Sequence, residues 1–143
     1  MVDGLISKQH NPEIIKALES LLITFQKNRN AAMDEFISFL SKKPMTTELI
    51  NSIKTTAAET PTDAGVVILR DEIELTDFEA ALTRVKKPLV FAYTPSLQKN
   101  ADFLKAKLGE KVQLVRFEES GHALFADEPA KFNQMIRKQL DAK

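Results

Sequence analysis

One histidine stands where it could do proton-transfer chemistry. His122 follows a run of β-forming apolar residues in Glu118-Glu119-Ser120-Gly121-His122. Ligands of open α/β sheets bind at the carboxyl ends of the strands, and imidazole titrates near neutral pH. Gly121 permits a tight turn and the close approach of another chain. His122 is therefore a candidate general base, and the alternative is an ordinary solvated loop histidine.

Other reactive side chains are few. His10 precedes Asn11-Pro12 at a predicted helix start, where a surface position is expected. Two histidines this far apart give no metal-binding spacing, so we predict neither a metal nor a cofactor. The chain has no cysteine, which excludes disulfides, thiolate metal sites and a cysteine nucleophile.

The elements that must position His122 form a β-α-β-α unit. Leu89–Tyr93 is predicted to be a strand buried on both faces, and the spacing predicts a helix over Leu97–Leu108 that Gly109 ends. Val112–Phe117 is the second strand, parallel to the first, and the last helix starts at Asp127-Glu128-Pro129. Two strands make an incomplete parallel sheet, because its edges are open and the crossover helix covers one side.

Residues 11–84 are predicted to form five short helices. The first runs from Pro12 to about Gln26 behind a cap at Asn11, and its apolar residues recur every three or four positions. The other four are expected to start near Asn30, Thr46, Thr60-Pro61 and Thr76-Asp77. Most of the phenylalanines fall on predicted buried faces, namely Phe25, Phe36, Phe39, Phe78, Phe91, Phe103, Phe117 and Phe132.

Composition sets broad limits on class and partners. Apolar residues make up 43% of the 143 residues, which is enough for a core of ordinary size. Twenty basic residues balance twenty acidic ones, so no net field favours nucleic acid or an anionic membrane. The absence of a secretory leader pattern, of a long apolar run and of cysteine makes a cytoplasmic location the default expectation.

The segment around His122 resembles the histidine-bearing end of α/β-hydrolases. The family pattern of Gly-His, an acid about five positions on, a proline and a Phe-Asn pair occurs in register at Gly121, His122, Asp127, Pro129 and Phe132-Asn133. The good match covers Pro88–Leu140. Residues 11–84 are similar only in layout to the helical cap of such enzymes.

The resemblance implies an α/β fold in three parts. Residues 1–10 would be the end of a sheet strand and a loop, residues 11–84 a helical cap-like region, and residues 85–143 the C-terminal β-α-β-α unit.

The resemblance also implies roles for individual residues. His122 would be the general base that activates a serine, with a carboxylate orienting its ring. The usual Gly-x-Ser-x-Gly turn for that serine is absent from the sequence. The loop Thr94–Asn100, where the acid commonly lies, has none, and Asp102 is expected at the surface. Asp3, in a stub of an earlier strand, is the first candidate for the acid. Phe125 could line an acyl pocket or pack under the last helix.

We therefore expect the C-terminal portion of an esterase- or lipase-like α/β-hydrolase that acts on a small-molecule substrate. It should be inactive alone, because the nucleophile is missing. The alternative is a non-catalytic, hydrolase-like interaction domain that forms a homodimer through its open sheet edge. Neither interpretation predicts binding to nucleic acid or to a membrane.

Overall fold

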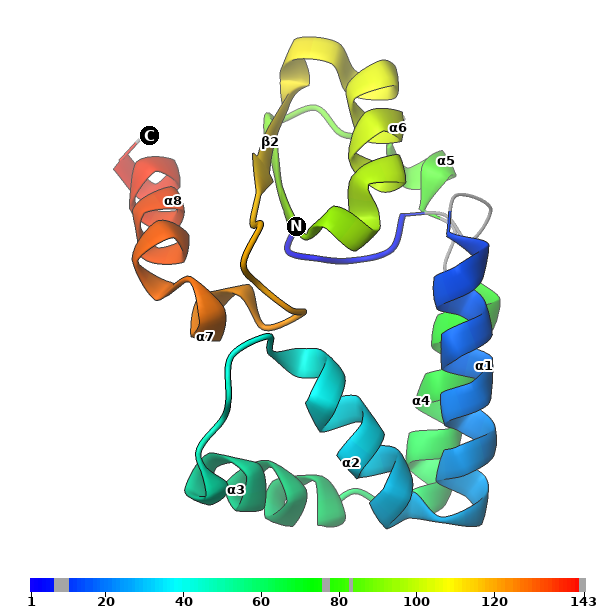
Figure 1. Cartoon of the computed structure of the whole chain (residues 1–143). Helices are drawn as coiled ribbons and strands as arrows, with labels where there is room; N and C mark the ends of the chain where they lie inside the picture. Colours follow the sequence, from blue (N-terminus) through cyan, green and yellow to red (C-terminus); the bar gives the residue numbers. More distant parts are fainter. Residues whose placement is uncertain (7–10, 76–77, 83, 142–143) are drawn as a thin grey trace.

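The computed structural model describes residues 1–6, 11–75, 78–82 and 84–141 (Figure 1). The helices and strands follow in the order α1 (Pro12–Lys27), α2 (Arg29–Leu40), α3 (Thr47–Ala58), α4 (Thr62–Leu75), α5 (Glu79–Leu82), β1 (Leu89–Tyr93), α6 (Gln98–Leu108), β2 (Val112–Arg116), α7 (Leu124–Asp127) and α8 (Pro129–Asp141). Two 3-10 turns, η2 (Pro95–Leu97) and η3 (Gly109–Lys111), flank α6. The predicted α/β class, with a helical block followed by a β-α-β-α unit, is confirmed.

The sheet of the described residues has two parallel strands and the start of a third. β1 pairs with β2 in the register Leu89↔Val112 to Tyr93↔Arg116. On the other side of β1, Val2 forms a parallel bridge with Ala92. The amide of Asp3 donates to the Ala92 carbonyl at 2.7 Å. Residues 1–3 therefore extend the sheet by one short segment.

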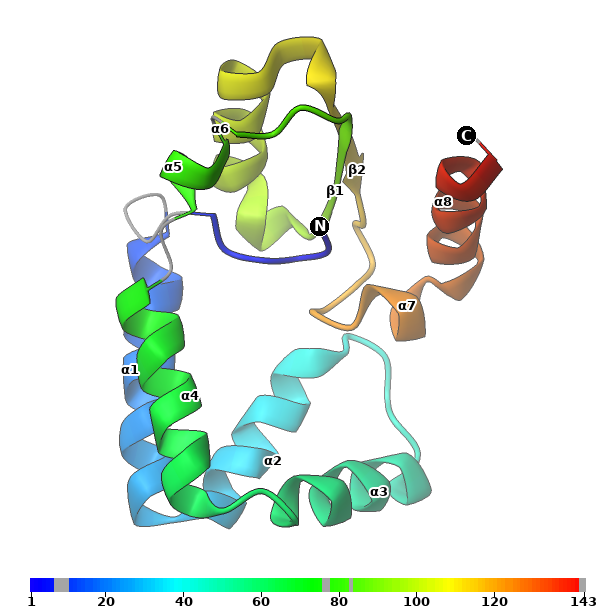
Figure 2. The same cartoon turned by 180° about the vertical axis from the view of Figure 1, so that it is seen from behind.

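The two faces of the sheet pack on different helices. Successive side chains of a strand point to opposite faces, so Phe91 and Tyr93 join the core under α6 while Val90 and Ala92 lie on the side of α8. Figure 1 shows α6 and α8 on opposite sides of β2, and Figure 2 shows the same from behind. The crossover helix α6 covers one face, as expected, and α8 folds back over the other face and contributes Phe132 and Met135.

The first four helices form a thin block beside the sheet. α1 packs along α2 and α4, and both figures show α1 and α4 side by side. Such a layer buries only one stripe of each helix. The predicted burial of Phe36 and Phe39 on α2 was therefore wrong, since they are 37% and 59% exposed. The predicted burial of Phe78, which directly precedes α5, was also wrong, since it is 50% exposed.

Local signals were read correctly at some helix ends and wrongly at others. The Thr46 side chain accepts from the Leu49 amide and caps α3 as predicted, but Asn28, not Asn30, caps α2. Asn11 makes no side-chain cap, and its Nδ2 atom donates to Asn100 Oδ1 at 2.8 Å. Gly109 ends α6 with φ of +56°, as predicted.

The short helix α7 was not predicted, and the expected helix start at Thr76-Asp77 lies outside the described residues. Within the described ranges, every helix is too short or too polar to cross a lipid bilayer.

Candidate active site

Three chain segments bring polar side chains to one edge of the sheet. Asp3 follows the bridge at Val2, Thr94 follows β1, and His122 lies in the loop after β2. All three strand segments run parallel. Their carboxyl ends therefore meet at the same edge, which is where ligands of such sheets bind.

Asp3 and His122 are hydrogen-bonded to each other. The Asp3 Oδ2 atom lies 3.1 Å from His122 Nδ1. The second carboxylate oxygen, Oδ1, accepts from the Thr94 amide at 2.8 Å and from the Thr94 hydroxyl at 2.9 Å. Asp3 is 6% exposed. Its φ of +39° lies in the left-handed region, which Asp tolerates better than most residues. The carboxylate is thus held on both sides and oriented toward the imidazole.

The surroundings of His122 favour its protonated form. The hydrogen bond to Asp3 raises its pKa, partial burial lowers it, and the negative charges of Asp3 and Glu72 raise it further, so the net pKa lies above the ordinary 6.5. The Phe39 ring stacks on the imidazole with 6.1 Å between ring centroids and 27° between planes. Because Nδ1 is engaged by Asp3, Nε2 is the nitrogen left for proton transfer.

His122 lies in the wall of a cavity of about 560 Å³. The lining comes from the N-terminal segment, the end of α2, the loop after β1 and the histidine loop: Asp3, Ser38, Phe39, Ser41, Lys42, Thr94, Pro95, Ser96, Ser120, Gly121 and His122. The cavity therefore lies between the sheet edge and the helical block, with an imidazole in its wall.

Four serines line this cavity, and each hydroxyl is hydrogen-bonded to a group other than His122. Ser38 donates to the Glu35 carbonyl, Ser41 to Asp127 and Ser120 to Glu128, while Ser96 pairs with Thr94. A serine nucleophile needs the base within hydrogen-bonding reach. The hydrogen bonds of the described residues therefore give none of these serines that role.

A second cavity, of about 530 Å³, adjoins the first. It lies between α1 and α2 and shares Ser38, Phe39 and Ser96 with the cavity at His122. Most of its other lining is apolar, with two carboxylates: Glu13, Ile14, Ala17, Leu18, Leu21, Glu35 and Phe36. An apolar group could therefore lie beside an atom held at His122.

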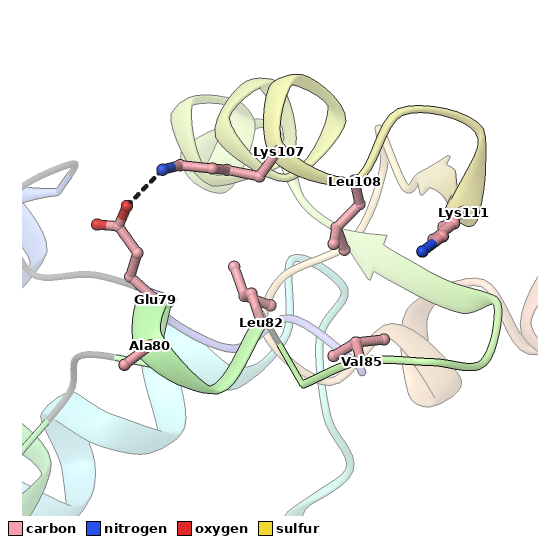
Figure 3. Close-up of a pocket in the computed structure, with 7 residues that line it drawn as sticks. All are labelled: Glu79, Ala80, Leu82, Val85, Lys107, Leu108 and Lys111. Atoms are coloured by element: carbon pink, nitrogen blue, oxygen red, sulfur yellow. Dashed lines mark ion pairs between the residues drawn. The ribbon is translucent and has the colours of Figure 1, made fainter.

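A third cavity, of about 630 Å³, is unrelated to this site. Figure 3 shows it between α5 and the end of α6, with Glu79 paired to Lys107 at 2.8 Å. Its floor is Leu82 and Leu108, and none of its lining residues is a histidine or a serine.

The structure brings together some of the predicted site residues and separates others. Asp3 and His122 meet. Phe125 does not line the cavity at His122; it is 61% exposed on α7 and packs edge-on against Phe132. Asp102 is exposed on α6, as expected, and His10 lies outside the described residues.

Sequence reasoning missed two residues of the site, Thr94 and Phe39. Thr94 had a usable signal, since it is the first polar residue after a predicted strand. Phe39 had none, because its contact with the histidine ring depends on how the helical block packs against the sheet.

Comparison with known proteins supports the fold. No protein-family model matches the sequence, and no curated protein matches it. An esterase from Exiguobacterium antarcticum has a similar structure, with a TM-score of 0.73 at 18% sequence identity. The fold of this chain is similar to that of this esterase over most of the chain. The match covers 89% of this chain and 48% of the esterase, so the chain spans about half the length of that protein. At this identity the likeness shows similarity of fold and assigns no reaction.

Proposed function

We propose that this chain supplies the histidine, the acid and the substrate-binding helices of an ester hydrolase whose nucleophilic serine lies outside these 143 residues. The observation that carries the proposal is the hydrogen bond between His122 Nδ1 and a buried carboxylate, at the carboxyl edge of a hydrolase-like sheet. A titratable group with a specific charged partner, in the wall of a cavity of about 560 Å³, is a typical candidate for a functional site.

The chemistry follows from the two ring nitrogens. Nε2 takes the proton of the serine hydroxyl as the serine oxygen attacks the ester carbonyl, and the imidazolium that forms is stabilised by Asp3 through Nδ1. The same proton then passes to the departing alkoxide, which leaves as an alcohol. Water repeats the sequence on the acyl-serine, releasing a carboxylic acid and restoring the neutral imidazole.

The two adjoining cavities suggest the class of ester. The cavity between α1 and α2 has apolar walls, so an aliphatic or aromatic acyl group is stabilised there by burial. Glu13 and Glu35 line the same cavity and repel an anionic acyl group. We therefore propose neutral esters of apolar acids as substrates, and esters of dicarboxylic acids as poor ones.

The test begins with the coding DNA on the N-terminal side of Met1. The proposal expects an in-frame strand followed by Gly-x-Ser-x-Gly. A protein that includes this segment should hydrolyse p-nitrophenyl butyrate, and His122→Ala and Asp3→Ala should each lower kcat/KM by roughly 10⁴-fold or more. His10→Ala is the matched control and should lose little.

The 143-residue chain by itself should show no turnover above that of its His122→Ala variant. Robust turnover by this chain that survives His122→Ala contradicts the proposal, as does coding DNA that lacks any such upstream segment.

A second candidate function is non-catalytic association through the sheet edge. Among the described strands, β2 pairs along one edge only, and Ile136 and Leu140 on α8 are 38% and 60% exposed. An unpaired edge beside exposed apolar side chains is a typical surface for association. Light scattering on the purified chain separates the two: a compact dimer supports association, and a stable monomer counts against it.

A further inference from the structure

Asp127 is a buried carboxylate that the proposed chemistry does not use. It is 0% exposed and lies at the end of α7, five residues after His122. Its partners belong to two different parts of the chain, the loop that carries the histidine and the segment that follows α2. Burying a carboxylate is costly unless hydrogen bonds compensate for the lost water, so the partners explain why it is there.

Four donors surround the carboxylate. The Ser41 hydroxyl and the amides of Lys42 and Lys43 come from the end of α2, here residues 41–43, which directly follow Leu40. The two amides donate at 2.9 and 3.3 Å. The fourth donor is the amide of Gly121, 2.7 Å from Oδ2. Burial raises the pKa of Asp127, but the Ser41 hydroxyl and the three amides outweigh it, so the net pKa lies below the ordinary 3.8. The group therefore stays ionised and keeps all four donors.

Other contacts join the same two segments. The Ala123 amide donates to the Leu40 carbonyl at 2.7 Å, and the Lys42 ammonium to the Glu118 carbonyl at 2.7 Å. The Lys43 ammonium donates to the backbone carbonyl of Asp127 itself. His122 thus lies between Gly121, whose amide is bonded to Asp127, and Ala123, whose amide is bonded directly to Leu40.

We propose that Asp127 is a positioning residue: it fixes the loop of His122 to the end of α2, and so holds the imidazole against Asp3. This proposal rests on the proposed function only for its catalytic meaning, because the position of the histidine can be measured without any reaction. It also assigns a role to the end of α2, since a movement of that end would be transmitted through the carboxylate to the histidine.

The test is the pKa of His122, followed by imidazole resonances in NMR spectra of the 143-residue chain. Asp127→Asn replaces one accepting oxygen of the carboxylate by an NH₂ group, so some of the four donors around residue 127 lose their acceptor. The expected result is a folded variant in which the pKa of His122 loses most of its upward shift and returns toward the ordinary 6.5. The matched control, Asp102→Asn on exposed α6, should leave that pKa unchanged.

Ser41→Ala distinguishes a displaced His122 ring from the loss of the negative charge of Asp127. It removes one donor without changing any charge, so a fall in the pKa of His122 in this variant reports displacement of the ring, not the loss of a nearby negative charge. It also keeps the proposal testable if Asp127→Asn fails to fold.

The proposal is overturned if folded Asp127→Asn titrates at His122 like the wild type, or if Ser41→Ala does so when Asp127→Asn cannot fold. Failure of ester hydrolysis would count against the proposed function alone and leave this result standing.

Discussion

Gly121→Ala should be destabilising, because the added methyl group has no room. A Cβ at this position would lie 2.8 Å from the Leu40 carbonyl oxygen and 3.0 Å from Ser41 Cα. Both are backbone atoms of the α2 end, so no side-chain rotation relieves the contact. Overpacking of this kind costs about 1–3 kcal/mol. A displaced loop would also weaken the hydrogen bond from the Gly121 amide to Asp127.

The expected change is a loss of about 1–3 kcal/mol in the free energy of unfolding, or roughly 3–10 °C in Tm for a chain of this size. Gly4→Ala is the matched control, since its nearest neighbours lie at 3.8 Å. That variant should be unchanged, or more stable by up to about 1 kcal/mol through the unfolded chain. Urea unfolding followed by far-ultraviolet circular dichroism measures both. Equal midpoints for the two variants would refute the claim that the histidine loop packs directly on the α2 end.

Three further outcomes follow from the site. The raised pKa of His122 contributes stability that is fully present below 6.5 and is lost as pH rises through the folded-state pKa. His122→Asn should therefore remove this part of the pH dependence of Tm, which lies between 6.5 and the folded-state pKa. The lowered pKa of Asp127 contributes stability above 3.8 that is lost as pH falls through the folded-state value, so Asp127→Asn should remove this part of the acid sensitivity in an acid titration of ellipticity. Phe39→Ala uncovers the imidazole and should speed its modification by diethyl pyrocarbonate severalfold, whereas the same change at exposed Phe125 should have no effect; equal rates in the two variants would contradict the stacking geometry.

The β-α-β-α unit could be predicted from sequence because its signals are local. The strand at Leu89–Tyr93 is a short apolar run, the helix that follows ends at a glycine, and the final helix starts at a proline. These signals depend on residues that are neighbours in the chain, so the secondary structure that they predict does not depend on how the rest of the chain packs.

The burial of side chains in the helical block was harder to predict from sequence, because it depends on which helices pack against each other. Phe36 and Phe39 stand at helix spacings typical of a buried face, yet they line cavities between α1, α2 and the histidine loop. Periodicity identifies an apolar stripe and does not say whether another helix or a hollow faces it.

The candidate site could be predicted in part. His122 has a signal in its own neighbourhood, whereas Asp3 could be chosen only by resemblance, 119 residues away along the chain. The set of four donors around the Asp127 carboxylate could not be found from sequence at all. Its donors at residues 41–43 are mostly backbone amides, which every residue except proline carries.

The titration of His122 in the wild type and in Asp3→Asn tests most directly whether Asp3 orients the imidazole. We expect a wild-type pKa above 6.5, with the neutral ring protonated at Nδ1 and facing Asp3. In Asp3→Asn the new amide group donates to Nδ1, so the pKa should fall and the ring proton should move to Nε2, both visible in imidazole nitrogen shifts. His10→Gln assigns the two histidine signals. An Asp3→Asn variant with the wild-type pKa and the wild-type tautomer would contradict the claim that Asp3 orients His122 as a base.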